Sequence, residues 1–206
     1  MKNQTNSLKT IAALALVNSM LLCSQASADD EDSIRFPLVR PAVLSNECLP
    51  QAQGTVNISK LGNVEIMDVK IQGLPKNTEF DVFVIQVPHA PFGMAWYQGD
   101  IQTNGSGKGF AHFAGRFNEE TFIVAPGVAS APVVHDGQIA DAAENPATAP
   151  VHTYHIGIWF NSPADAVKAG CPGATTPFNG EHTAGIQILN TSNFADEEGP
   201  LLQLKP

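Results

Sequence analysis

Residues 73–117 read GLPKNTEFDVFVIQVPHAPFGMAWYQGDIQTNGSGKGFAHFAGRF, and this pattern of turns and apolar residues indicates the fold class. Turn-forming residues come first, and an apolar strand is predicted after them over residues 79–87. Phe80, Val82 and Val84 share one face of this strand, and Phe83, Ile85 and Val87 lie on the other. A strand with two apolar faces is covered on both sides, so we expect it to be central in a sheet.

Further short strands are predicted on both sides of the strand at 79–87. The tip of a hairpin is indicated by NGSG at residues 104–107, and residues 151–160 alternate most clearly between apolar and other residues. Ser162-Pro163 and Gly170 mark the start and the end of a short helix. About eight or nine short strands, one short helix and long loops predict an all-β protein, an antiparallel β-sandwich.

Two segments depart from regular alternation. Residues 63–72 alternate, but their apolar phase changes between Ile66 and Met67. Such a change predicts a β-bulge, or a strand that is buried on both faces. Residues 126–150 have no strong period, and a loop of this length in a compact domain is typically functional or poorly ordered.

Two resemblances to known families bear on the fold and the compartment. GLPKNTEFDVFVIQ, residues 73–86, resembles the corner between strands E and F of fibronectin type III and other immunoglobulin-like sandwiches, although Phe80 stands where those domains have tyrosine. This resemblance implies an immunoglobulin-like β-sandwich. A longer run, which continues through FNSPADAVKAGCPG (160–173) to FNGEH (178–182), resembles a family of uncharacterised secreted bacterial proteins. That family implies secretion and the same fold, and it provides no catalytic residues to transfer.

The N-terminus has the pattern of a secretory leader. A basic segment precedes an apolar run over residues 11–23, and an A-x-A cleavage site follows at 26–28. The apolar run is shorter than a bilayer requires, and no second apolar run of spanning length follows. We therefore expect a signal peptide over residues 1–28 and one mature domain over residues 29–206, secreted or periplasmic.

The composition restricts the partners of the protein. The chain has 20 acidic and 11 basic residues, and its formal net charge is −9. Such an acidic surface argues against nucleic acids and against anionic membranes as partners. A glycan or a protein at the cell surface is the kind of partner that remains, and the sequence assigns no oligomeric state.

The mature chain contains two cysteines, Cys48 and Cys171. An even pair in a secreted protein is typical of a disulfide. A shared metal site is the competing interpretation, but neither cysteine has the second cysteine of a C-x-x-C pair. The predicted disulfide closes a long loop, for which the chain-entropy model gives about 4–5 kcal/mol of stabilisation.

Histidines provide one hypothesis for a functional site. A copper or zinc site would combine a strand with loops, and its candidate ligands are His135, His152, His155 and His182. However, His152 and His155 are three residues apart on a predicted strand, so they face opposite sides. Otherwise these histidines are ordinary surface and loop residues.

Calcium is the other metal to consider. Asp136, Asp141 and Glu144 lie close together in the segment 126–150 and could hold it, but the calcium-loop pattern is absent. We therefore predict no cofactor, and copper, zinc and calcium remain only as alternatives.

Aromatic residues provide a further hypothesis. Trp96 and Tyr97 lie at a predicted corner, and Trp159 is on the outer face of the strand at 151–160. Exposed rings of this kind stack on sugars, so the three predict a ligand surface for carbohydrate. The competing interpretation is that Trp159 belongs to the core, as a tryptophan on a central strand often does.

No catalytic residue can be assigned from these patterns. Turn and core residues account for nearly every motif, so the favoured interpretation is a secreted, non-catalytic binding or structural protein of the cell envelope or extracellular space. A metal-dependent extracellular enzyme of the copper or zinc type and a carbohydrate-binding module are the alternatives. Whether the protein is an enzyme is left open, with the non-catalytic interpretation preferred.

Overall fold

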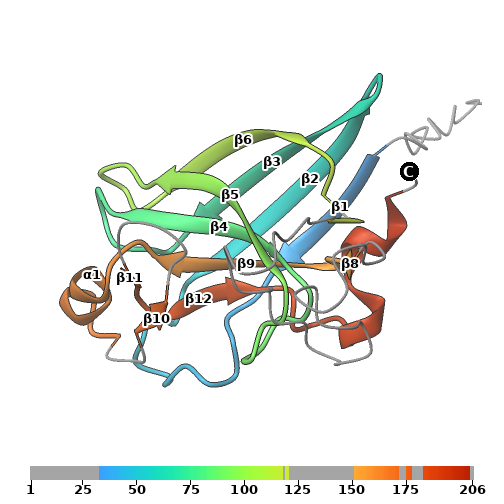
Figure 1. Cartoon of the computed structure of the whole chain (residues 1–206). Helices are drawn as coiled ribbons and strands as arrows, with labels where there is room; N and C mark the ends of the chain where they lie inside the picture. Colours follow the sequence, from blue (N-terminus) through green and yellow to red (C-terminus); the bar gives the residue numbers. More distant parts are fainter. Residues whose placement is uncertain (1–32, 118, 121–150, 172–174, 178–182, 205–206) are drawn as a thin grey trace, which may run out of the picture.

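A computed structural model of the chain describes residues 33–117, 119–120, 151–171, 175–177 and 183–204. It contains two antiparallel sheets of four strands, which form a sandwich (Figure 1). The predicted all-β sandwich is therefore confirmed, whereas its immunoglobulin-like character stays a prediction. The predicted signal peptide (1–28) and the segment 126–150 lie outside the described residues.

The first sheet has the strand order β1-β2-β3-β6. Its strands are β1 (Ser33–Leu38), β2 (Gln53–Leu61), β3 (Val64–Gln72) and β6 (Gly109–Gly115). The second sheet has the order β12-β9-β4-β5. Its strands are β4 (Glu79–Ile85), β5 (Ala95–Gln102), β9 (His155–Phe160) and β12 (Gln187–Asn190).

Shorter elements complete the described chain. Two small pairs are β7 (Glu119–Glu120) with β8 (Val151–His152), and β10 (Thr176–Pro177) with β11 (Thr183–Ala184). The helical elements are α1 (Pro163–Lys168) and the 3-10 turns η1 (Asp196–Glu198) and η2 (Pro200–Gln203). Helix α1 lies at one end of the sandwich, and the 3-10 turns lie at the other end (Figure 1).

The core lies between the two sheets, and β4 is central in its sheet. β4 pairs with β5 on one side and with β9 on the other, as the two apolar faces of this segment predict. Its inward side chains, Phe80, Val82 and Val84, have no exposed surface. They belong to one cluster that also includes Val56, Ile58, Met67, Val69, Ile156, Ile158 and Phe160.

Backbone bridges connect the two sheets along both edges. Val39 and Asn190 each donate to the carbonyl of the other at 2.8 Å, which ties the end of β1 to β12. A second bridge joins Thr103, after β5, to Gly109 at the start of β6. Open strand edges can pair with other chains, so these bridges protect the sandwich from such pairing.

The phase change in β3 has a different origin from the one that the sequence predicts. β2 and β3 pair without any register shift, so the predicted bulge is wrong, and the outward Ile66 is only partly buried. Glu65 faces inward and is 2% exposed. Its Oε2 accepts a hydrogen bond from the Phe117 N–H at 2.9 Å, and its Oε1 lies 3.8 Å from Arg116 Nε. A carboxylate with its own partners therefore occupies an inward position at this end of the sheet.

The predicted disulfide is present between Cys48 and Cys171, whose Cα atoms are 4.9 Å apart. Helix α1 leads the chain to Cys171. Ser162 caps this helix, because its Oγ accepts a hydrogen bond from the Asp165 N–H at 3.1 Å. Gly170 ends the helical segment with a φ of 75°, a conformation that favours glycine.

Within the described part of the chain, no helix is both long enough and apolar enough to span a membrane.

Candidate binding face on the second sheet

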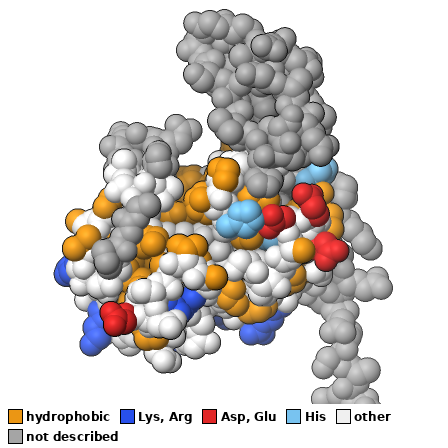
Figure 2. Space-filling view, turned by 90° about the horizontal axis from the view of Figure 1, so that it is seen from below, with side chains coloured by type: hydrophobic (Ala, Val, Ile, Leu, Met, Phe, Trp, Pro, Cys, Tyr) orange, Lys and Arg blue, Asp and Glu red, His pale blue; other side chains and the backbone are white. Residues whose placement is uncertain are grey.

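The second sheet carries unusual side chains on its outer face, the side turned away from the core. Residues alternate between the two faces of a strand, so Asp81, Phe83 and Ile85 of β4 point outward. Ile85 packs with Trp159 of β9 in a small buried cluster separate from the main core. Figure 2 views the molecule from below the orientation of Figure 1. It shows apolar side chains across the middle of that side and histidine and acidic side chains towards one end.

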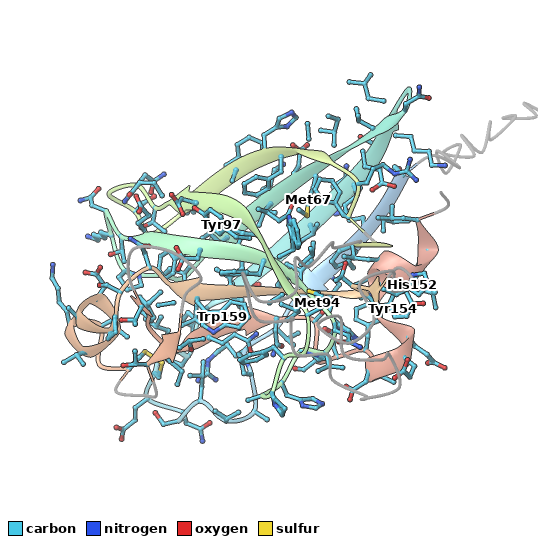
Figure 3. The ribbon with its side chains drawn as sticks, viewed as in Figure 1. Met67, Met94, Tyr97, His152, Tyr154 and Trp159 are labelled. Atoms are coloured by element: carbon cyan, nitrogen blue, oxygen red, sulfur yellow. A yellow bond between two sulfur atoms is a disulfide. The ribbon has the colours of Figure 1, made fainter. Side chains whose placement is uncertain are left out.

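Four aromatic rings form a continuous line on this outer face, which we call the ring row. Tyr97 of β5 contacts Phe83, with ring centroids 5.5 Å apart, and Phe83 contacts Trp159 at 5.3 Å. Phe92, from the loop between β4 and β5, packs edge-on against Trp159 at 5.0 Å. Figure 3 shows Tyr97 and Trp159 at their positions on β5 and β9. The ring row therefore crosses three strands and one loop.

Gly157 provides the space that Trp159 occupies. A Cβ atom at Gly157 would lie 2.4 Å from Cζ3 and 2.5 Å from Cη2 of the indole, and 2.6 Å from Nε2 of Gln187. These distances are well below van der Waals contact, so any larger residue would displace both side chains. Trp159 and Gln187 thus lie side by side over the same glycine.

A β-bulge in β5 brings Tyr97 and Asp100 to the same face. Residues three apart in a regular strand face opposite sides, but the register shifts within the β4–β5 pair, and Gln98 is the extra residue. Gly99 accompanies the bulge with a φ of 141°. The Tyr97 hydroxyl consequently donates a hydrogen bond to Asp100 Oδ1. Asp100 itself lies directly opposite Asp81 of β4.

Asp81 and Asp100 form a carboxyl pair, in which Asp81 has no exposed surface and Asp100 is exposed. Burial raises the pKa of Asp81 from 3.8 to about 7, and the negative charges of Asp100 and Glu79 act in the same direction. Burial and the hydrogen bond with Asp100 also raise the pKa of Tyr97. The pair therefore holds a proton at pH values where exposed carboxyl groups are ionised.

Three buried side chains of this face carry polar atoms without hydrogen-bonding partners, although Gln187 Oε1 accepts a hydrogen bond from the Asn190 amide at 2.9 Å. They lie in line across β12, β9 and β4, because Gln187 pairs with Trp159 and Trp159 pairs with Asp81. In the part of the chain that the structure describes, four of their side-chain atoms have no hydrogen-bonding partner: Gln187 Nε2, Trp159 Nε1 and both carboxyl oxygens of Asp81. We call these three residues the polar row. A buried polar group left unpaired costs about 1–3 kcal/mol, so the row needs an explanation beyond packing.

The predicted aromatic surface is not one surface. Trp96 pairs with Val84, which points into the core, whereas Tyr97 pairs with the outward Phe83. Trp96 and Tyr97 are 44% and 42% exposed, and they face opposite sides of β5. Trp159 is on the outer face as expected but is 3% exposed. Of the three predicted residues, Tyr97 is therefore the one exposed on the outer face of the second sheet.

The histidines predicted as metal ligands do not form a site in the described residues. His155 is buried, its Nδ1 lies 2.8 Å from Thr191 Oγ1, and its Nε2 lies 2.9 Å from the Asp196 carbonyl oxygen. Burial lowers the pKa of His155, which favours the neutral ring. A metal ion could bind His155 only by replacing one of these two contacts.

His152, the other described histidine of that set, stacks on Tyr154 with ring centroids 5.3 Å apart (Figure 3). The remaining predicted ligands lie outside the described residues; they are His135, His182, Asp136, Asp141 and Glu144. No group of three histidine, cysteine or acidic residues within the described ranges is arranged to hold a metal ion.

Sequence patterns gave one usable sign of this face. Asp81 stands in the middle of an otherwise apolar strand, FDVFVI, and a charge at such a position requires a reason. The partners of Asp81 could not be found in this way, because Asp100 and Gln187 look like ordinary polar strand residues. Comparisons of the chain with family models, curated proteins and solved structures find no match.

Proposed function

We propose that this chain is a secreted, non-catalytic binding protein of the cell envelope or extracellular space, with its ligand on the outer face of the second sheet. The observation that carries the proposal is the ring row, which reaches the surface at Tyr97 beside the exposed Asp100. Binding sites typically combine aromatic side chains with a few placed polar groups. Here a hydroxyl group and a carboxyl group flank the exposed end of the rings.

Secretion is the part of the proposal that rests on the sequence and the disulfide. The leader pattern at residues 1–28 directs export, and Cys48–Cys171 is a bond that persists in oxidising compartments. An extracellular or periplasmic location fits both. The metal-dependent alternative is not favoured, because His155 already uses both ring nitrogens.

Printed arrays of glycans and of peptides test the binding function directly. The mature chain is compared with Tyr97→Ala, and with Phe110→Ala as the matched control, since Phe110 is an exposed aromatic residue on β6 of the other sheet. We expect array signals that Tyr97→Ala reduces by about tenfold, the effect of losing about 1.4 kcal/mol of contact, and that Phe110→Ala leaves unchanged. Mass spectrometry should recover the bound probe intact.

The absence of signal on both arrays would contradict the proposal. Equal binding by the wild type and Tyr97→Ala would place the ligand elsewhere on the molecule. Release of a cleaved or oxidised probe would show turnover and would overturn the non-catalytic assignment.

A further inference from the structure

The unpartnered polar atoms of this protein are concentrated in one place. In the described residues, five buried side-chain atoms have no hydrogen-bonding partner, and four of them belong to the polar row, Asp81, Trp159 and Gln187. The fifth is Nε of Arg40, whose guanidinium group also donates to the carbonyl of Cys48. Native structures pair nearly all buried polar groups, so four unpaired atoms on three adjacent strands indicate a site built for a partner.

The chemistry of the row restricts what this partner can be. The indole of Trp159 and the amide of Gln187 are donors, whereas Asp81 is an acceptor through at least one oxygen in either protonation state. A cation would pair with Asp81 and leave both donors unpaired. An anion would pair with the two N–H groups and leave the acceptor oxygen of Asp81 unpaired. A hydroxyl group both donates and accepts, so neighbouring hydroxyls on a neutral molecule can pair with the whole row.

The spacing and the surroundings of the row fit a ring that carries several hydroxyl groups. Adjacent strands are about 4.8 Å apart, so neighbouring members of the row are separated by about the width of a sugar ring, and the whole row is about 10 Å long. Phe83 and Phe92 contact Trp159 on its flanks and are both only partly buried. These rings offer apolar contact for the C–H face of such a ligand.

Phe92, on the loop between β4 and β5, packs against Trp159, the middle residue of the polar row. This loop is held by the Asn190 amide, which donates to the Pro88 carbonyl at 2.8 Å, and by the exposed contact between His89 Nε2 and Asp196 Oδ2 at 2.9 Å. Within the loop, the Val87 N–H donates to the Phe92 carbonyl at 3.2 Å. Phe92 covers Trp159 from a loop and not from a strand, so its displacement leaves both sheets intact. A ligand would therefore enter by replacing the contact between Phe92 and Trp159.

We infer that the polar row binds a neutral, hydroxyl-rich ligand, a sugar ring, through Asp81, Trp159 and Gln187, with Phe92 displaced from Trp159. This inference rests on the proposed binding function and gives it a ligand class.

The two tryptophans of the chain make a direct test possible. In a nitrogen–proton correlation spectrum of the ¹⁵N-labelled mature chain, each indole N–H gives one signal, and Trp159 is assigned by its absence in Trp159→Phe. The probes are glucose, N-acetylglucosamine, cellobiose and maltose, with arginine and inorganic phosphate as charged controls. We expect at least one sugar to shift the Trp159 signal saturably, while the exposed Trp96 signal and the charged probes show no effect.

Matched variants identify the groups that bind. Asp81→Asn keeps an acceptor oxygen and should bind within about threefold of the wild type, whereas Asp81→Leu removes both oxygens and should weaken binding by about tenfold or more. Gln187→Met removes the other end of the row and should weaken binding similarly. Gln102→Leu, on the exposed part of β5, is the control and should bind as the wild type does.

The possible failures separate this inference from the proposed function. A Trp159 shift with arginine or phosphate and with no sugar would overturn the ligand class and leave the binding function standing. Sugar binding that Asp81→Leu and Gln187→Met do not weaken would overturn the assigned groups. If no probe shifts Trp159 while the array signal still depends on Tyr97, the inference fails alone; if the array signal is also absent, both fail.

Discussion

Asp81 shows how one residue can conflict with its surroundings. It lies in the centre of an apolar strand, has no exposed surface, and faces Asp100 across the strand pair. Ionisation of Asp81 would place a second negative charge beside Asp100 in a buried environment, so the neutral form is stabilised. The free energy of folding must therefore depend on pH through this carboxyl group.

Replacement of Asp81 by asparagine should stabilise the protein at neutral and higher pH. The pKa of Asp81 is about 7 in the folded chain, whereas an ordinary aspartate side chain has a pKa of 3.8. Between these values the folded chain holds a proton that the unfolded chain releases, so the stability of the wild type falls as pH rises from about 4 to about 7. Asparagine does not titrate, so the stability of Asp81→Asn does not fall over this pH range. Its free energy of unfolding should exceed that of the wild type by on the order of 3–4 kcal/mol at about pH 8, with little difference at about pH 4.

Urea unfolding across this pH range measures the difference. Asp68→Asn, which changes a carboxylate on the outer face of the first sheet, serves as the control and should not show the same pH dependence. A variant Asp81→Asn that is less stable than the wild type at every pH would show that the carboxylate has a structural partner after all.

At the scale of elements, one irregular position decides which side chains meet. The bulge at Gln98 turns Tyr97 and Asp100 to the same face, although their spacing in a regular strand would separate them. On β3 the reverse occurs: the strand is regular, and Glu65 occupies an inward position that alternation alone would assign to an apolar residue. On β3 the hydrogen bond from the Phe117 N–H accounts for the inward Glu65 carboxylate, whereas on β5 the bulge itself brings Tyr97 and Asp100 together.

Glu65 should contribute to stability chiefly as a hydrogen-bond acceptor. Glu65→Leu leaves the Phe117 N–H without its partner and should lower the free energy of unfolding by about 1–3 kcal/mol. Glu65→Gln keeps an acceptor oxygen, so its free energy of unfolding should fall by less than that of Glu65→Leu. Chemical denaturation of both variants provides the comparison, and equal losses in the two would refute the role assigned to the hydrogen bond.

At the scale of the whole molecule, the sandwich is connected in several independent ways. Bridges at Val39–Asn190 and Thr103–Gly109 link the sheets at both edges. The disulfide Cys48–Cys171 spans 123 residues of sequence and joins the segment before β2 to the end of helix α1. The bond therefore restricts the unfolded chain strongly.

Removal of the disulfide should lower stability without changing the fold. According to the chain-entropy model, the free energy of unfolding of the double variant Cys48→Ala/Cys171→Ala should be lower by about 4–5 kcal/mol. A thermal unfolding scan would record this loss as a lower Tm. A reducing agent should lower the Tm of the wild type and have no effect on the double variant. An unchanged Tm in the reduced wild type would contradict this role.

The sequence by itself determined the features that depend on local pattern. The apolar pattern is enough to predict a sandwich and to make the strand predicted at 79–87 central in its sheet, because a strand with apolar residues on both faces is covered on both sides. The capping of helix α1 by Ser162 and the pairing of Cys48 with Cys171 follow from residue type and number.

Only the tertiary structure decided which side chains form the candidate site. Trp96, Tyr97 and Trp159 look equivalent as aromatic residues, yet the pairing of β5 with β4 places Trp96 and Tyr97 on opposite faces, and Gly157 lets Trp159 fold into a buried position. The polar row combines residues of β4, β9 and β12, and its alignment depends on strand register. Register is set by contacts between segments distant in the chain, so local sequence pattern does not contain it.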